Sequence, residues 1–532
     1  MFNLSNIVEA IQTITLSVHR LPLPRTTITG VSTDTRTLKR GEMFVALSGE
    51  RFDGHTFMKD AFHAGCSVAI VSEEWHTHNA NTHYPVIVVR SPLDALGMVA
   101  LWWRRKFKIP VICIAGSNGK TSTKDMTAAV LSKKFKVHKT QENLNNKIGI
   151  SKALLKIEKQ HKAVVLELGT NRSGEIAWLC RIAEPTHGLL TNIGKDHLQY
   201  LRSMEGVAGE NGDVFAYLGA HDGFAFVNGD DRLVQYQASY RGANKHWEYS
   251  FTTRNADVKG KYLGLTSTGG AHFSFTHRGA GTVSVTLQAI GEHLSSNALA
   301  AATVGLHFGV KGAAIKSALE SYIPDDSHAY GRLRVEQVAL DGKRGRVVTI
   351  LNDTYNANPE STYAALESLF VIKPRSRHIA ILGDMLELGE ISKAEHENVG
   401  VWLLDSDIDE VFLVGEEMFD AYEAIKSNRR LDVPLSASKR GKKTPQRKRM
   451  KVQDVATSYF PLNEKDHLVE VLFTTLRNDD VVLVKGSRGT RMEEIITALK
   501  KNMQTQAPKV VKKSKSAKAS KSKSLKPKSS KH

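Results

Sequence analysis

Short apolar runs alternate with longer helix-like stretches over most of the chain. In the middle of the chain the apolar runs lie at 111–114, 163–168, 188–193 and 223–227. After residue 330 they return at 347–351, 378–382, 411–414 and 481–484. The helix-like stretches around them lie at 125–134, 295–307, 360–370, 392–404 and 491–501. Strands that alternate with helices are typical of mostly parallel α/β sheets, so we expect two such sheets.

The first hundred residues follow a less regular pattern, with short strand signals and many turns. Strand-like runs occur at 41–47 and 86–89, and a helix-like stretch at 92–107 closes the segment. A chain of 532 residues is also too long for one compact core. We therefore predict an α/β protein with three folded domains and a tail, with boundaries at 1–107, 108–328, 329–505 and 506–532.

The positive charge of the chain is concentrated in two places. Residues 508–532 hold ten lysines, residues 437–451 hold eight lysines and arginines, and together they equal the whole net charge of +18. A tail of lysine and serine is typical of a disordered, solvated segment. Both segments lack aromatic residues for base stacking, so we expect no specific nucleic-acid partner. A weak, non-specific attraction to RNA or to an anionic membrane stays open.

Several sequence features bear on the compartment. The chain has no apolar run long enough to span a membrane, and residues 1–14 lack the basic start of a signal peptide. The cysteines Cys66, Cys113 and Cys180 lie far apart, without the spacing of metal ligands. We therefore expect a cytoplasmic monomer without disulfides and without a membrane span.

The segment 115–122 carries the strongest chemical signal. It reads Ala-Gly-Ser-Asn-Gly-Lys-Thr-Ser and lies between an apolar strand and a helix-like stretch. Glycines let backbone N–H groups approach phosphate oxygens, the helix N-terminus and Lys120 add positive charge, and the Thr121 hydroxyl can bind Mg²⁺. The loop departs from the common phosphate-binding motif because Ile114 occupies the position of its first glycine. The pattern predicts a site for ATP or a similar nucleotide.

Polar residues follow several other predicted strands. Glu167 ends one strand and is a candidate Mg²⁺ ligand, while His197 follows the next strand as a candidate for a second metal or for substrate. The asparagine-rich loop 143–146 suits sugar or phosphate recognition. In the last third, polar motifs at 353–361, 383–389 and 485–488 each follow an apolar strand. In open α/β sheets ligands bind at these strand ends.

These motifs, in this order, resemble the Mur ligase family over residues from about 25 to about 500. The segments Gly-Ser-Asn-Gly-Lys-Thr and Glu-Leu-Gly-x-Asn-x-x-Gly-Glu-Ile match its central domain. Asp-x-Tyr-Asn-Ala-Asn-Pro-x-Ser, Gly-Asp-Met-x-Glu-Leu-Gly and Lys-Gly-Ser-Arg resemble the members that join D-Ala-D-Ala to UDP-N-acetylmuramoyl-tripeptide. The resemblance implies a small N-terminal domain that binds the UDP-sugar, a central ATPase-like parallel sheet and a C-terminal Rossmann-like domain.

The resemblance also implies ATP-driven amide-bond formation in peptidoglycan precursor synthesis. The carboxylate of the tripeptide would attack the γ-phosphate of ATP, and the amine of D-Ala-D-Ala would then displace phosphate from the acyl phosphate. Catalytic roles are implied for Lys120, Glu167, His197 and Lys485, and Mg²⁺ contacts for Thr121, Glu167 and His197. Nucleotide contacts are implied for Gly116, Ser117, Asn118, Gly119, Lys120, Thr121, Ser122, Asn297, Arg332, Asp353 and Asn356. Substrate contacts are implied for Ser32, Thr33, Asp34, Arg36, Asn143, Asn145, Asn146, Ser487 and Arg488.

The chain departs from the family pattern at two positions. Asn211 stands where relatives usually have a lysine that is carbamylated and binds a second Mg²⁺. Our hypothesis is that Glu210 or Asp213 substitutes for the carbamate, or that the second metal is held more weakly. Leu294 stands where relatives usually have an asparagine near the nucleotide base, so adenine contacts there stay in question.

Two alternative functions stay open from the sequence. One is a sister ligase that adds a single amino acid, or a folylpolyglutamate-type synthetase that shares the central domain. The other is a non-catalytic relative that keeps the fold and binds nucleotide or nucleic acid. Asn211 favours lost activity, whereas Lys120, Thr121, Glu167, His197 and Lys485 favour an active ligase.

Overall fold

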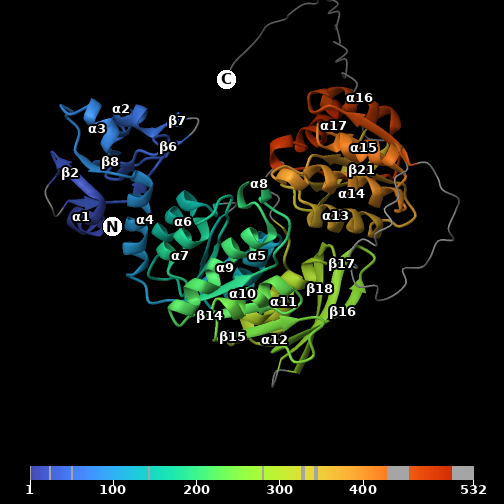
Figure 1. Cartoon of the computed structure of the whole chain (residues 1–532), viewed down its shortest axis with the longest axis horizontal. Coiled ribbons are helices and arrows are strands. Elements are labelled where there is room, and N and C mark those ends of the chain that lie inside the picture. Colours follow the sequence, from blue (N-terminus) through green and yellow to red (C-terminus); the bar gives the residue numbers. More distant parts are fainter. Residues whose placement is uncertain are drawn as a thin grey trace, which may run out of the picture.

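A computed structural model describes residues 2–22, 26–49, 52–141, 144–277, 281–324, 330–340, 345–427 and 455–505. The chain forms three α/β bodies, each with its own main sheet, that follow one another along an arc (Figure 1). The expected three-part α/β architecture is therefore confirmed, while the exact domain boundaries stay predictions. The predicted tail at 506–532 and the whole basic segment 437–451 lie outside the described residues.

The N-terminal body contains a five-stranded sheet in the order β2-β9-β8-β5-β4. Its strands are β2 (Thr15–His19), β4 (Val31–Ser32), β5 (Met43–Val45), β8 (Val68–Ser72) and β9 (Val86–Val89). Two short ribbons pair β1 (Phe2–Asn3) with β3 (Thr27–Ile28) and β6 (Ser48–Gly49) with β7 (Phe52–Asp53). Its helices are α1 (Leu4–Ala10), α2 (Met58–His63), α3 (Glu73–His78) and α4 (Pro92–Arg104).

Helix α4 joins the N-terminal body to the central one. The Trp178 Nε1–H donates to Asp94 Oδ1 at 2.8 Å, and Arg104 Nε donates to the Ala183 carbonyl at 3.0 Å. A Cβ on Gly97 would lie 2.7 Å from the Trp178 ring, so only glycine allows this close packing. The two bodies are thus held by packing as well as by the chain itself.

The central body contains a nine-stranded sheet in the order β11-β12-β10-β13-β14-β15-β16-β17-β18. The strands from β11 to β16 pair in parallel, whereas β16, β17 and β18 form an antiparallel extension. Its strands are β10 (Val111–Ala115), β11 (Val137–Lys139), β12 (Ala163–Glu167), β13 (His187–Leu190), β14 (Phe224–Asn228), β15 (His246–Ser250), β16 (Val258–Leu265), β17 (Gly270–His277) and β18 (Gly281–Ile290). Apolar side chains fill both faces, because the middle strands lie between two helical layers.

The helices of the central body cover these two faces (Figure 1). They are α5 (Lys120–Ser132), α6 (Lys147–Leu155), α7 (Glu175–Ala183), α8 (Leu198–Leu201), α9 (Met204–Ala220), α10 (Arg232–Tyr240), α11 (Leu294–His307) and α12 (Gly312–Glu320). The helix predicted at 125–134 begins five residues earlier, at Lys120, because the glycine turn passes into it without a linker.

The C-terminal body contains a six-stranded sheet in the order β19-β20-β24-β21-β22-β23. Its strands are β19 (Arg334–Ala339), β20 (Val347–Asp353), β21 (His378–Gly383), β22 (Glu410–Val414), β23 (Ala456–Phe460) and β24 (Val481–Lys485). Its helices are α13 (Pro359–Val371), α14 (Ser392–Leu404), α15 (Met418–Lys426), α16 (Lys465–Thr475) and α17 (Glu493–Thr505). Only the β19–β20 pairing is antiparallel, so the expected mostly parallel sheet is confirmed.

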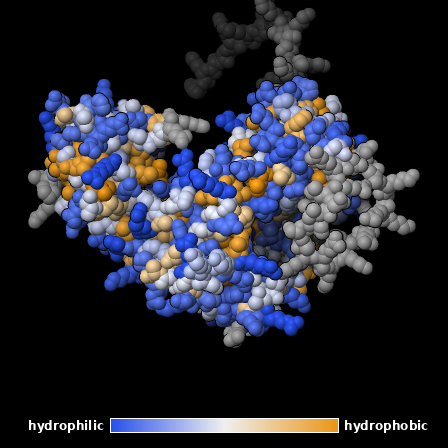
Figure 2. Space-filling view, viewed as in Figure 1, coloured by the Kyte–Doolittle hydropathy of each residue, from blue (hydrophilic) through white to orange (hydrophobic). Residues whose placement is uncertain are grey.

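On the face that Figure 2 shows, many residues are hydrophilic, and hydrophobic residues gather on the N-terminal body at the left. On that body Leu16 and Val18, of the edge strand β2, are exposed. Among the described residues, no helix has the length and apolar character needed to cross a membrane.

Candidate functional site

A cavity of about 890 Å³ lies between the central and C-terminal bodies. The phosphate loop and the ends of β12 and β13 line one side. The ends of β20 and β24 and the start of α13 line the other. The lining residues on both sides lie at the carboxyl ends of parallel strands, where the backbone leaves the sheet and polar side chains can converge. The strand-end motifs singled out from the sequence therefore meet in one place.

The phosphate loop runs from β10 into α5. Gly119 caps α5 with φ of +78°, a conformation that favours glycine. A Cβ on Gly116 would lie 2.3 Å from Thr191 Oγ1, so this glycine lets the loop pass close to β13. Lys120 Nζ donates to the carbonyls of Gly116 and Ser117, at 2.5 and 2.9 Å. Ser117, Asn118, Gly119, Lys120, Thr121 and Ser122 line the cavity.

Two buried oxygen atoms beside this loop have no hydrogen-bond partner, Thr121 Oγ1 and Glu167 Oε2. The register of β12 against β10 places Glu167 opposite Ile114, next to the start of the loop. The other oxygen, Glu167 Oε1, accepts a hydrogen bond from Asn145 Nδ2 at 2.9 Å. A hydroxyl and a carboxylate are oxygen donors of the kind that Mg²⁺ prefers. The residues therefore fit a magnesium ion, held by Thr121 and Glu167.

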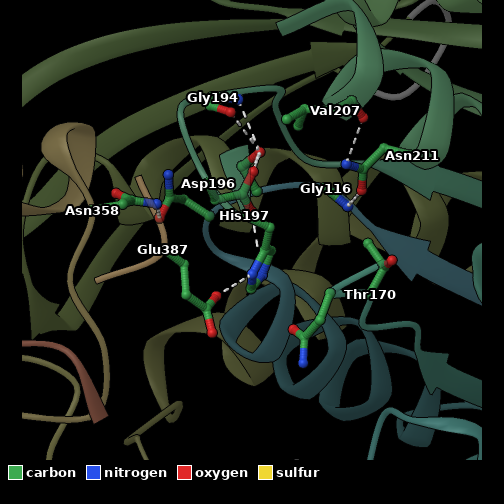
Figure 3. Close-up of polar contacts among 12 residues, drawn as sticks. Gly116, Thr170, Gly194, Asp196, His197, Val207, Asn211, Asn358 and Glu387 are labelled. Atoms are coloured by element: carbon green, nitrogen blue, oxygen red, sulfur yellow. Dashed lines mark hydrogen bonds and ion pairs between the residues drawn. The ribbon is translucent and has the colours of Figure 1, made fainter. Parts of the chain in front are cut away.

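His197 has an ion-pair partner on the opposite body. Its Nδ1 lies 2.6 Å from Glu387 Oε2, and this contact crosses the cavity (Figure 3). The hydrogen bond from His197 lowers the pKa of Glu387, while burial acts against it. Within the described residues, no group of three or more histidine, cysteine or acidic side chains could hold a metal. The second-metal role of His197 stays a prediction.

The C-terminal side of the cavity is built on a buried ion pair. Asp353 and Lys485 face each other in the register of β20 and β24, and Lys485 Nζ donates to Asp353 Oδ2 at 2.6 Å. Lys485 also donates to the Asn356 carbonyl at 2.9 Å, which fixes the loop after β20. The guanidinium of Arg332 stacks on Tyr355, 3.7 Å from the ring centre. Ser487 and Arg488 follow β24 and line the cavity with them.

Asn297, for which the family resemblance implies a nucleotide contact, lies over the phosphate loop. A Cβ on Gly119 would be 2.5 Å from Asn297 Oδ1, so the loop passes directly beneath this side chain. Leu294, one turn earlier on α11, also lines the cavity. An apolar side chain there can contact a base by its face, although it offers no hydrogen bond.

The structure places the carboxylates near Asn211 outside the cavity. Glu210 accepts hydrogen bonds from the Gly174 and Ile176 backbone and from the Thr170 hydroxyl, at 2.7 to 2.9 Å. Asp213 lies 3.4 Å from Arg241. Neither lines the cavity, so their present contacts do not support the hypothesis that one of them replaces a carbamate.

The expected substrate residues divide into two groups. Asn145 and Asn146 line the cavity, whereas Asn143 lies outside the described residues. Ser32, Thr33, Asp34 and Arg36 form a separate polar turn on the N-terminal body, away from the cavity lining. There the Arg36 guanidinium lowers the pKa of Asp34 to about 2.

Some cavity residues were not assigned a role from the sequence. Asn358 Nδ2 donates to Asn118 Oδ1 at 3.0 Å, and Glu360 accepts from the Lys195 backbone, so both join the two bodies. Asp196 accepts from the Ser117 hydroxyl at 2.7 Å (Figure 3). Each of these residues belongs to a polar motif that follows a strand, and this position was the sequence signal from which a place in the cavity could have been predicted. Their partners depend on how the bodies meet, which no local pattern reveals.

Comparisons with known proteins agree with this geometry. Three family models match in chain order: the Mur ligase family catalytic domain over 27–103, the Mur ligase middle domain over 114–305, and the Mur ligase glutamate ligase domain over 333–488. Together they match most of the described chain.

Curated and solved relatives cover nearly the whole chain. The UDP-N-acetylmuramoyl-tripeptide–D-alanyl-D-alanine ligase of Escherichia coli (strain K12) is 34% identical, over 90% of this chain and 94% of its own. The protein of the same name from Bacillus subtilis (strain 168) is 32% identical, over 89% and 94%. The crystal structure of MurF from Acinetobacter baumannii superposes with a TM-score of 0.77 at 28% identity, over 94% of this chain and 99% of its own. The chain therefore belongs to the Mur ligase family.

Proposed function

We propose that this enzyme joins D-Ala-D-Ala to UDP-N-acetylmuramoyl-tripeptide at the expense of ATP, in peptidoglycan precursor synthesis. The observation that carries the proposal is that one cavity is lined by Lys120, Thr121 and Glu167 from the central body and by Asp353 and Lys485 from the C-terminal body. ATP and both peptide substrates need such a two-sided site, because phosphoryl transfer and amide formation occur at the same carboxyl group.

The first step forms an acyl phosphate. A carboxylate oxygen of the tripeptide attacks the γ-phosphorus, the bond to the bridging oxygen breaks, and ADP leaves. Such a reaction depends on positioning and on neutralising charge rather than on covalent catalysis. The backbone N–H groups where the loop enters α5, together with Lys120, hold the β- and γ-phosphates. Thr121 and Glu167 would hold a magnesium ion, which would supply positive charge against the phosphate oxygens.

The second step forms the amide. The free amine of D-Ala-D-Ala attacks the acyl carbon, giving a tetrahedral intermediate whose collapse releases phosphate. The Lys485 ammonium, Ser487 and Arg488 offer donors on the C-terminal side for the carboxylates and for the charge that develops on oxygen. Arg332, stacked on Tyr355, is held ready for an anionic group of the nucleotide.

We propose that the UDP-sugar lies along α6. The N-cap of this helix, Asn146, lines the cavity, and Lys152 near its other end donates to Thr33 Oγ1 at 3.4 Å. Six residues of helix span about 9 Å. A long UDP-muramoyl-peptide can therefore have its UDP near Ser32, Asp34 and Arg36 and its peptide carboxylate in the cavity.

The domain limits at 107/108 and 328/329 and a cytoplasmic location are part of the same proposal. ATP, the proposed energy source, is supplied in the cytoplasm. The cysteines Cys66, Cys113 and Cys180 are buried free thiols, which suits a reducing compartment.

The test is phosphate release from ATP by purified protein with Mg²⁺, UDP-N-acetylmuramoyl-tripeptide and D-Ala-D-Ala, each omitted in turn. We expect release only when all are present. Release with a single amino acid in place of D-Ala-D-Ala would identify a sister ligase. Silence under all conditions would contradict an enzymatic function.

A further inference from the structure

The side chain of Asn211 fastens the start of the phosphate loop to helix α9. Asn211 Oδ1 accepts the Gly116 backbone N–H at 2.9 Å, and Nδ2 donates to the Val207 carbonyl at 3.0 Å (Figure 3). Only 2% of the residue is exposed, so water cannot replace either bond. Gly116 comes 95 residues earlier in the chain, which makes this a tertiary contact rather than a local turn.

The preceding residue, Glu210, fastens a second loop to the same helix. Its carboxylate oxygens accept hydrogen bonds from Thr170 Oγ1, Gly174 N and Ile176 N. This loop begins directly after β12, whose last residue is the candidate magnesium ligand Glu167. Two consecutive residues of α9 thus hold both segments that surround the triphosphate and magnesium position.

The chemistry of the two side chains is complementary. The amide of Asn211 donates and accepts at once, as its two partners require, and it brings no charge next to the loop. It also has no amine that carbon dioxide could convert to a carbamate. Glu210 uses both oxygens on backbone and hydroxyl donors. Among the described residues, this part of α9 therefore offers no free carboxylate to a second cation.

We propose that Asn211 is a positioning residue that holds Gly116 in the phosphate-binding conformation, and that the nucleotide is bound with a single protein-held divalent cation, at Thr121 and Glu167. This inference rests on the proposed use of ATP by the same cavity. In this chain the neutral side chain of Asn211, which binds the phosphate loop, therefore stands where relatives usually have a charged metal ligand.

The test measures ADP binding rather than turnover. Asn211→Leu has a similar size and removes both hydrogen bonds, while Asn211→Asp keeps the acceptor, loses the donor and adds a negative charge. A buried N–H left without a partner costs enough to weaken ADP binding by roughly tenfold. The matched control is Thr303→Val, which removes a buried bond to the Leu299 carbonyl without touching the loop.

Manganese supplies the second readout. We expect the electron paramagnetic resonance titration of the wild-type ADP complex with Mn²⁺ to give a single tight site, unchanged when carbon dioxide is excluded from the buffer. Near-wild-type ADP affinity of both folded Asn211 variants would overturn the positioning role. A second tight Mn²⁺ site, lost in Glu210→Gln, would overturn the single-cation claim. Wild-type protein that binds no ADP would refute the proposed function itself, together with this inference.

Discussion

His197 Nδ1 lies 2.6 Å from Glu387 Oε2, although the two residues are 190 positions apart and belong to different bodies. The backbone N–H of Gln199 donates to the carbonyl of the same glutamate at 3.0 Å. Glu387 is therefore one of the residues by which the C-terminal body holds the loop after β13, along with Glu360 and Glu395, which contact Lys195. Closure of the cavity depends in part on this pair.

Replacement of Glu387 by glutamine should weaken this closure without unfolding either body. The amide keeps an acceptor but loses the charge, and the glutamate side chain is 38% exposed, so solvent screens the pair. We expect a loss of about 0.5–1 kcal/mol, seen as a two- to fivefold lower kcat/KM. Small-angle X-ray scattering should show a larger average radius. An unchanged radius and an unchanged rate would show that the pair does not contribute to closure.

The carboxyl group of Asp384 should make the stability of the protein depend on pH. Burial raises its pKa from 3.8 to about 6, so the folded protein binds this proton more tightly than the unfolded chain does. Ionisation therefore costs folding free energy progressively as the pH rises from about 4 to about 6. Asp384→Asn keeps an acceptor for the Met418 N–H and avoids this cost. We expect it to gain about 1–3 kcal/mol over wild type at pH 7.5 and little at pH 4.

Urea unfolding at a series of pH values measures this difference. A gain that is the same at both ends of the pH range would mean that ionisation of Asp384 is not its cause.

Replacement of Glu167 by glutamine should raise the Mg²⁺ concentration that the reaction requires. The amide can still accept from Asn145, but it loses the charge that a divalent cation requires. We expect the Mg²⁺ concentration for half-maximal rate to rise about tenfold or more, with a lower kcat. The matched control is Glu184→Gln, which breaks an ion pair with Arg105 far from the cavity. Equal magnesium curves for wild type and Glu167→Gln would remove Glu167 from the metal site.

Variants of the buried pair Asp353 and Lys485 should distinguish an effect on stability from an effect on catalysis. Lys485→Met leaves a carboxylate without its partner, which in buried pairs costs about 3–5 kcal/mol. The double variant Asp353→Asn, Lys485→Met removes the unpaired charge and should recover most of that stability. Its activity should stay at least a hundredfold down, because the ammonium is absent from the cavity. Recovery of activity together with stability would show that Lys485 is purely structural.

Deletion of residues 506–532 should leave turnover unchanged. The prediction rests on the composition of this segment, since ten lysines and many serines without aromatic residues suit a solvated tail. Steady-state rates of the full and shortened chains at the same salt concentration test it. A large loss of kcat on truncation would assign the tail a role in the reaction.

The sequence predicted the local features of this molecule better than its long-range contacts. The alternation of strands and helices and the glycine loop at 115–122 depend on neighbouring residues, so a single chain reveals them. The contact between Asn118 and Asn358 spans 240 positions and depends on how two bodies meet. The register that sets Asp353 opposite Lys485 likewise depends on strand order, which no local pattern carries.

The departure from the family pattern at Asn211, and the role considered for its neighbour Glu210, show the same limit. Asn211 could be recognised as unusual from its position, yet its bond to Gly116 required the packing of α9 against the loop. Glu210 was a reasonable candidate for a metal ligand by its charge alone. Its oxygens turned out to accept from the backbone of the neighbouring loop.

Lys120 gives the phosphate loop a way to release what it binds. Its ammonium has two acceptors of its own, the carbonyls of Gly116 and Ser117, within the loop that it serves. When phosphate binds, its oxygen must compete with these carbonyls for the ammonium. When phosphate leaves, the ammonium can bind the carbonyls again. The ammonium of Lys120 therefore has hydrogen-bond acceptors both with and without phosphate. Loss of its bonds to the carbonyls offsets part of the free energy that it gains on binding phosphate. An enzyme that must let ADP go after every cycle gains turnover from a cation that can return to its own backbone.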